Sequence, residues 1–310
     1  MFIERKNYNN TISIKLVIPT SCNAKCPFCY NNDKNMNCNK IEFLNNFINS
    51  LKDILDKIGN KNPVSIDITG GEPTLDISLI KEVLHQLKIN DIHSKVSRIV
   101  MTTNGINLLE LINTCEDMNV IDYINISVHD YNATRRFEIF KTKILTDFEY
   151  RLMINKCNEL NIKCSAISVL FKNFEDDIEF KYWFERFIYW AKKCGFIGIR
   201  FRYSCDDNLY CGEFNNYMQQ IIDDSFYDVI TFENTPDSCW CRLRRKNDGF
   251  RVFFLHGVKD TTLYTKGIEY IIDNDEKCYC DYYKKTPIEH YKYEIGKIYD
   301  NEDYMKGEYI

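Results

Sequence analysis

Three cysteines near the start of the chain are the residues with the clearest chemistry. Cys22, Cys26 and Cys29 fall in the segment CNAKCPFCY. Thiolates this close together can wrap one face of a metal cluster. A [4Fe–4S] cluster has four irons, so three cysteines leave one iron without a protein ligand, and an open coordination position is where a metal centre does chemistry. The alternative is a zinc site, which would need a fourth ligand and usually a second close pair, and the nearest further cysteine is Cys38.

Three other segments could hold a small polar ligand. Gly70-Gly71-Glu72-Pro73 joins two glycines, which let a ligand approach the backbone, to a carboxylate that can hold an ammonium group. The others are Thr102-Thr103-Asn104-Gly105 and Ser127-Val128-His129. Each has a plainer alternative. Gly-Gly-x-Pro and Asn-Gly are ordinary turn sequences, and His129 could be a capping histidine or one satisfied within the core.

These segments follow stretches that the residue pattern predicts to be strands. Strands are predicted at 12–18, 64–69, 97–102, 121–128, 162–170 and 197–203. Helices are predicted between them at 41–58, 76–88, near 106–117, near 148–160 and near 176–194. Such alternation is typical of a parallel α/β protein with right-handed crossovers. Six units do not close an eight-stranded barrel, so we expect a partial, open (β/α)6 barrel over residues 1–203.

In this arrangement the polar segments meet at one edge. All four lie at the carboxyl ends of successive predicted strands, the rim where β/α barrels build their active sites. Strand alternation places Ser127 and His129 on the same face. In the sixth strand, Arg200 and Arg202 alternate with Phe201. One of these arginines could reach an anion at the site, although an ion pair with an acidic neighbour is the plainer role.

With these motifs in this order, residues 12–203 resemble the radical S-adenosylmethionine (SAM) superfamily. The resemblance rests on Cys22-x3-Cys26-x2-Cys29, with aromatic Phe28 before the last cysteine, and on the GGEP segment. It implies that the three cysteines hold a [4Fe–4S] cluster, whose fourth iron is chelated by the methionine amine and carboxylate of SAM. It further implies that an electron from the cluster cleaves SAM to a 5′-deoxyadenosyl radical, which abstracts hydrogen from a substrate.

The resemblance also implies a set of SAM contacts. The GGEP segment would grip the amino group of SAM, and the end of the fourth strand would meet its ribose and carboxylate. His129 departs from the acidic or amide residue that is more common there. An external flavodoxin- or ferredoxin-like donor would supply the electron. The cofactor contacts expected on this basis are Phe28, Gly70, Gly71, Glu72, Pro73, Asn104, Ser127, His129 and Arg200.

Composition narrows the class of protein. The net charge of −5 gives no broad basic field for nucleic acid. No apolar signal segment and no membrane-length apolar run is found, so we expect a soluble, cytoplasmic protein without a membrane partner. The 14 cysteines are then expected to be reduced. The short run Arg242, Arg244, Arg245, Lys246 is expected in a solvated loop.

Residues 204–310 are expected to form a small, mostly-β extension that faces the substrate. A helix is expected near 213–224, and 249–283 alternate like strands, with FRVFFLHGV and IEYIIDNDEKCYCDYY as possible hairpin arms. Cys239, Cys241, Cys278 and Cys280 could hold a second cluster or a zinc ion. The alternative is reduced cysteines in a small β-meander.

The substrate is the least determined feature. Radical chemistry belongs to the cofactor and needs no side-chain base. We favour a peptide or natural-product precursor. A viperin-like or molybdopterin-cyclase-like enzyme acting on a nucleotide would need basic residues lining the barrel, for which Arg200, Arg202 and Lys172 are candidates. An activase or methylthio-type enzyme would need a partner protein or a second cluster. A non-catalytic zinc or iron–sulfur sensor or scaffold would use the same cysteines.

Overall fold

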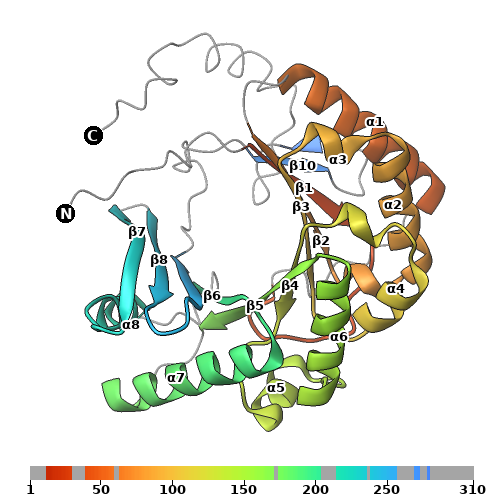
Figure 1. Ribbon diagram of the computed structural model, residues 1–310. Helices are drawn as coiled ribbons and strands as arrows, with labels where there is room; N and C mark the ends of the chain where they lie inside the picture. Colours follow the sequence, from red (N-terminus) through yellow and green to blue (C-terminus); the bar gives the residue numbers. More distant parts are fainter. Residues whose placement is uncertain are drawn as a thin grey trace, which may run out of the picture.

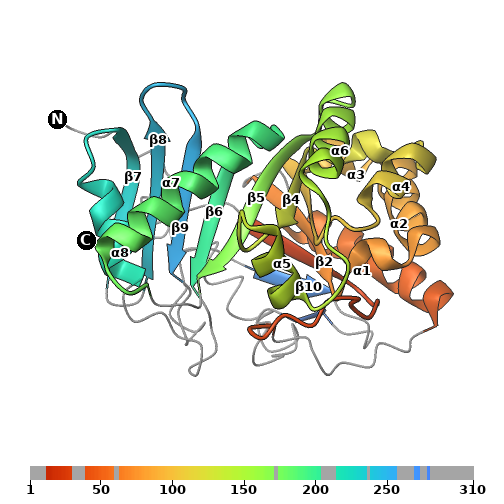
Figure 2. The ribbon, with the colours of Figure 1, turned by 90° about the horizontal axis from the view of Figure 1, so that it is seen from below.

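The structure is a computed structural model in which one curved sheet carries helices on its convex side (Figures 1 and 2). It describes residues 12–29, 39–58, 63–170, 174–203, 214–235, 238–256, 269–272 and 278–279.

The eleven strands of this sheet lie in the order β11-β10-β1-β2-β3-β4-β5-β6-β9-β8-β7. The run from β10 through β1–β6 to β9 is parallel, and β11, β8 and β7 are antiparallel to their neighbours. In Figure 1 the sheet forms an arc with β7 and β10 toward its two ends. This confirms the expected parallel, open barrel with a mostly-β C-terminal part. The strands are β1 (Ile12–Ile18), β2 (Val64–Gly70), β3 (Arg98–Thr103), β4 (Tyr123–Ser127), β5 (Lys163–Leu170), β6 (Gly198–Tyr203), β7 (Tyr227–Thr235), β8 (Ser238–Arg245), β9 (Arg251–His256), β10 (Glu269–Ile272) and β11 (Cys278–Tyr279).

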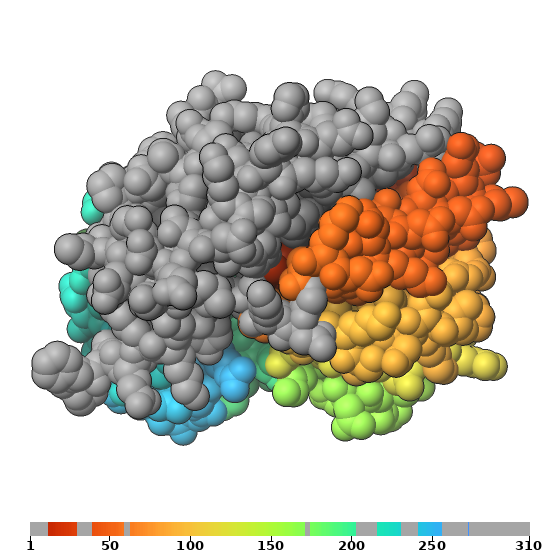
Figure 3. Space-filling model, turned by 90° about the horizontal axis from the view of Figure 1, so that it is seen from above, coloured from red at the N-terminus to blue at the C-terminus, as the bar shows by residue number. Residues whose placement is uncertain are grey.

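The predicted helices are present within a few residues of their expected ends, and Figure 3 shows α1 and α2 side by side on one flank. The short helices α3 and α5 and the 3-10 turns η2 and η3 were not predicted. The helical elements are α1 (Lys40–Ile58), η2 (Pro73–Leu75), α2 (Ile77–Ile89), α3 (Ile92–Lys95), α4 (Leu108–Thr114), η3 (Met118–Val120), α5 (Ala133–Phe140), α6 (Asp147–Glu159), α7 (Asp177–Cys194) and α8 (Phe214–Ile222). None of the described helices is long and apolar enough to cross a membrane.

The alternation within each strand decides which side chains face the helices. In β6, Ile199 and Phe201 are buried, and Phe201 packs against Phe184 and Phe187 of α7. Their neighbours Arg200 and Arg202 therefore point to the opposite, concave face. The same rule buries the apolar residues of β1, Ile12, Ile14, Leu16 and Ile18, against the helices.

The C-terminal strands correct one prediction. The two segments expected to pair as hairpin arms lie toward opposite ends of the sheet, and their described strands do not pair with each other. β9 pairs with β6 and β8, whereas β10 pairs with β1 and β11. Alternation predicts that a segment is a strand but not which distant strand it joins.

A second correction concerns the basic run, which was expected in a solvated loop. Arg242, Arg244 and Arg245 belong to β8, a strand that was not predicted. Arg244 pairs with Asp228 at 3.7 Å, and Arg242 is only partly exposed. The prediction failed because β8 is paired on both sides, with β9 and β7, and its charged side chains find partners such as Asp228 that the sequence does not show to be neighbours.

Candidate active site

The cysteine loop leaves β1 at the carboxyl rim and is held in place by local hydrogen bonds. The N–H of Ala24 donates to Sγ of Cys22 at 3.4 Å, and the N–H of Cys29 donates to the Cys26 carbonyl at 3.1 Å. The N–H of Lys25 donates to the carbonyl of Phe140 at 2.8 Å, which joins the loop to the end of α5. These bonds hold the backbone of the loop that carries the three cysteines.

The thiols lie close enough to affect one another's ionisation. Burial raises the pKa of Cys22, and burial together with the neighbouring Cys29 and Cys22 raises the pKa of Cys26 to about 12. Within the described part of the chain, no three His, Cys, Asp or Glu side chains gather around a point that a single metal ion could fill. Soft thiolates spread in this way suit a cluster, whose ligands bind separate irons.

The two glycines of the GGEP segment permit a close approach, and the approach is to the chain's own backbone. A Cβ on Gly70 would lie 2.3 Å from the carbonyl oxygen of Ile18, and one on Gly71 would lie 2.2 Å from that of Thr20. The hydroxyl of Thr20 donates to the carbonyl of Glu72 at 2.8 Å. The segment is therefore packed against the exit of β1, just before Cys22.

Glu72 is buried, with 2% of its surface exposed, and its carboxylate is engaged within the protein. Oε1 accepts hydrogen bonds from the N–H of Thr74 at 3.0 Å, from its hydroxyl at 2.6 Å and from the hydroxyl of Thr103 at 2.5 Å. Oε2 accepts one from the N–H of Asn104 at 2.6 Å. Burial raises the pKa of Glu72, and these four donors act in the opposite direction. Pro73, which is also buried, begins η2 beside this network.

Asn104 extends the network to the cysteine loop. Its side-chain amide donates to Oδ1 of Asn23 at 2.7 Å, and its own Oδ1 accepts from the N–H of Ile106 at 3.0 Å. Gly105 turns the chain in the left-handed region, with φ +84°. Three rim segments that are distant in sequence thus meet in one hydrogen-bonded network: the cysteine loop, GGEP and TTNG.

His129 lies beside the same loop and is almost fully buried. Its ring is 4.7 Å from the ring of Phe28, edge-on, and 5.1 Å from that of Phe140. Nδ1 accepts a hydrogen bond from the N–H of Val169 at 3.1 Å, so the remaining ring proton belongs on Nε2. Burial lowers the pKa of His129 to about 3, which keeps the ring neutral. These contacts match the alternative of a histidine satisfied within the protein.

A cavity of about 380 Å³ opens beside this histidine. His129, Pro27 and Val169 form part of its wall, and Trp183 closes it with its indole N–H bound to Asp130 at 3.0 Å. Its size lies within the range of small-molecule sites.

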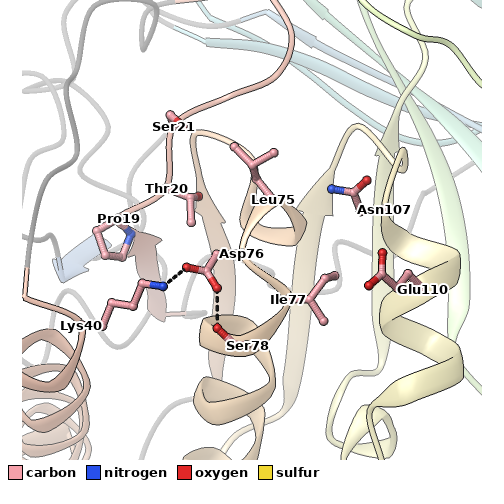
Figure 4. Close-up of a pocket in the computed structure, with 10 residues that line it drawn as sticks. All are labelled: Pro19, Thr20, Ser21, Lys40, Leu75, Asp76, Ile77, Ser78, Asn107 and Glu110. Atoms are coloured by element: carbon pink, nitrogen blue, oxygen red, sulfur yellow. Dashed lines mark hydrogen bonds and ion pairs between the residues drawn. The ribbon is translucent and has the colours of Figure 1, made fainter.

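A second, more open cavity of about 690 Å³ is lined by Thr20 and Ser21, which follow β1, and by Leu75 and Asp76, which follow the GGEP segment (Figure 4). Asp76 stands in its wall, where it pairs with Lys40 and accepts from the hydroxyl of Ser78 at 2.7 Å. Asn107 and Glu110 line the opposite side. The acidic and basic groups of this cavity largely pair with one another.

The remaining predicted residues lie on the concave face. Ser127 and Arg200 occupy one row across the sheet, because Ser127 pairs with Ile167, and Ile167 with Arg200. Lys172 and Cys280 lie outside the described residues, as does the side chain of Tyr203.

The C-terminal cysteines are divided between distant strands. β8, which carries Cys239 and Cys241, and β11, which begins at Cys278, lie near opposite edges of the sheet. Cys241 is fully buried in the main core. A second metal site on these four cysteines stays a prediction from the sequence, and the distance between β8 and β11 along the sheet does not support it.

Sequence reasoning missed several residues that build the site. Asn23 and Thr74 complete the network, together with Thr103, which was named only as part of its segment, and Phe140 packs on His129. The threonines stand directly beside residues that were selected, so adjacency was the available signal. Phe140 belongs to α5, whose start is marked by the N-cap Asn132 but whose length is too short for a clear periodicity.

Residues 16–180, more than half of the chain, match the Radical SAM superfamily. The chain belongs to this family, and membership implies an enzyme that uses SAM and an iron–sulfur cluster. The thiol set and the rim network described above fit these groups.

Individual relatives cover only part of the chain. A GTP 3′,8-cyclase of Pasteurella multocida (strain Pm70) is 28% identical over 122 residues, which are 39% of this chain and 34% of that protein. Streptococcus suis SuiB bound to precursor peptide SuiA is similar in structure with a TM-score of 0.50 and 15% identity, over 69% of this chain and 46% of that one. The protein anSMEcpe with AdoMet and the Cp18Cys peptide gives 0.52 and 14%, over 69% and 59%. The chain thus matches less than two thirds of each, and the structural likenesses show the fold alone.

Proposed function

We propose that Cys22, Cys26 and Cys29 bind one [4Fe–4S] cluster and that SAM binds beside it at the carboxyl rim. When bound, the cluster supplies the electron that cleaves SAM to a 5′-deoxyadenosyl radical, which abstracts hydrogen from the substrate. The observation that carries this proposal is the network joining Asn23, Asn104 and Glu72, because it connects the cysteine loop to the two segments assigned to SAM. A non-catalytic sensor would have no need of it.

The residues of the chain act in this proposal by placing ligands. The GGEP and TTNG segments form the wall on one side of the cysteine loop, where the amino group of SAM is expected. Because the Glu72 carboxylate already accepts four hydrogen bonds, we infer that it positions this wall and leaves the contact with SAM to neighbouring backbone groups. On the other side, Phe28, Ser127 and His129 border the space assigned to the ribose and adenine, next to the 380 Å³ cavity.

The proposed substrate is a peptide or natural-product precursor, and an external flavodoxin- or ferredoxin-like protein is the proposed electron donor. A second candidate is a nucleotide. It is favoured by the basic side chains on the concave face, where Arg242 joins Arg200 and Arg202. The partial likeness to a GTP 3′,8-cyclase is consistent with it.

The experiment that tests the proposal is anaerobic incubation of the reconstituted protein with SAM and dithionite. We expect 5′-deoxyadenosine and methionine to form in the wild type. A variant in which the three cysteines are replaced by alanine should form neither. Product formation that survives the triple substitution, or its absence from an iron-loaded wild type, would refute the proposed activity.

A further inference from the structure

Two guanidinium groups contact one aromatic ring on the concave face of the sheet. Arg200 comes from β6 and Arg242 from β8, and β9 lies between these strands (Figure 2). The guanidinium carbons lie 5.2 Å and 5.4 Å from the ring centroid of Phe253, which pairs with both arginines in register. The Phe253 ring therefore lies within cation–π distance of two like charges.

Two other arginines of β8 pair with carboxylates. Arg244 pairs with Asp228, and Arg245 pairs with Glu185 at 3.4 Å and Asp248 at 3.3 Å. Arg200, which is only partly exposed, forms neither an ion pair nor a hydrogen bond with another group in the part of the chain that the structure describes. A charge removed from water without a partner is costly.

Positive groups dominate the surroundings of Arg200 among the charges that act on its pKa. Burial and the neighbouring Arg202 lower the pKa of Arg200 to about 9; Asp67 acts in the opposite direction, and Arg98 and Arg242 lower it further. Asp67, the acidic group in this set, accepts a hydrogen bond from Ser13 at 3.0 Å. Among these groups acting on Arg200, the guanidinium groups outnumber the carboxylate.

The position of the pair relates it to the proposed SAM site. Ser127, Ile167, Arg200, Phe253 and Arg242 form one row across neighbouring strands. Two strand spacings separate Ser127 from Arg200, or about 10 Å. A ligand on the two arginines would lie within the barrel, beside the position assigned to SAM.

We propose that Arg200 and Arg242 form a subsite for an oxyanion group of the substrate, a phosphate or a carboxylate. Guanidinium groups bind both through paired N–H donors, and Phe253 fixes their spacing before the ligand arrives. This proposal rests on the proposed function for its place in the reaction. It differs from the expectation that Arg200 binds the carboxylate of SAM, because it assigns the arginine pair to the substrate.

The test uses two small probes, pyrophosphate and glutarate, and isothermal titration calorimetry on the reconstituted protein. The variants are Arg242→Gln and Arg200→Gln, with Arg200→Lys as a milder change. Arg244→Gln is the matched control, since Arg244 lies on the same strand and is already paired. Iron content and circular dichroism confirm that each variant is folded and loaded.

We expect at least one probe to bind the wild type and Arg244→Gln equally, and to bind both glutamine variants at least tenfold more weakly. Tighter binding of pyrophosphate would identify a phosphate as the natural group, and tighter binding of glutarate a carboxylate. Failure of the wild type to bind either probe, or unchanged binding in the folded glutamine variants, would overturn the subsite. So would a variant that binds the probes normally but loses SAM. Because the readout is probe binding, it is independent of whether the protein cleaves SAM.

Discussion

The carboxylate of Glu72 accepts a hydrogen bond from the backbone N–H of Asn104 at 2.6 Å. The two residues follow different strands, and Asn104 continues to Asn23 in the cysteine loop. The resemblance to the family assigned Glu72 to the amino group of SAM. Its burial and its four protein donors give it a structural role in the same site, and this changes how its substitution must be interpreted.

We expect Glu72→Ala to destabilise the protein by about 3 kcal/mol, because it leaves several buried donors without an acceptor. The Glu72→Gln variant should lose less, since its amide oxygen can still accept while its NH2 group cannot. Urea unfolding of the anaerobic protein measures both. Loss of SAM cleavage in Glu72→Ala would therefore not by itself identify a SAM ligand.

Glu110 provides the control for this comparison, because it is an exposed carboxylate on the other side of the same rim. Glu110→Gln should change the free energy of unfolding by less than about 0.5 kcal/mol. Equal stability of Glu72→Ala and the wild type would contradict the network's structural role.

Gly71→Ala tests the contact between the GGEP segment and the exit of β1. The added Cβ would lie 2.2 Å from the carbonyl oxygen of Thr20 and 2.7 Å from that of Ser21. Backbone must move to relieve this overlap, so we expect a loss of about 3 kcal/mol and less iron per chain after reconstitution.

Gly249→Ala is the control that separates steric overlap with the backbone, expected in Gly71→Ala, from the strain of a positive φ alone. Gly249 has φ +72° and nothing within 4 Å of an added Cβ. Alanine there should cost about 1 kcal/mol through its backbone conformation and leave iron uptake unchanged. Full iron content in Gly71→Ala would show that the cysteine loop does not depend on this contact.

His129→Ala removes the acceptor of the Val169 N–H and the ring between Phe28 and Phe140. We expect the KM for SAM to rise about tenfold, equivalent to about 1.4 kcal/mol, with the iron content retained. His129→Asn should recover part of the loss. Asparagine tolerates the positive φ of 66° found at this position and supplies an acceptor. A KM for SAM that is unchanged in His129→Ala would remove this residue from the cofactor site.

The sequence predicted the barrel and the rim well because both rest on local patterns. The alternation in β1 and β6 and the periodicity of α1 are readable from neighbouring residues, and parallel strands bring their carboxyl ends to one edge. The pairing between strands that are distant in the chain could not be predicted from the sequence. The hairpin predicted for 249–283 failed for this reason, and the basic concave face became visible only once β8 lay beside β9.

The sequence also could not predict which side chains would bind each other. The types of Glu72 and Asn104 pointed to a ligand site, but only their distances show that they bind each other. For the glycines the structure adds a second reason for the residue type, because the backbone of Ile18 and Thr20 approaches them closely. The expected approach of SAM to the same glycines stays a prediction.

The most direct test of the central claim is the content of iron and sulfide per chain after anaerobic reconstitution, in the wild type and in the variant with Cys22, Cys26 and Cys29 replaced by alanine. The account predicts about four irons in the wild type and none in the variant. Iron that survives the triple substitution would place a cluster on other cysteines. Zinc without iron in the wild type would contradict the claim that these residues hold a [4Fe–4S] cluster.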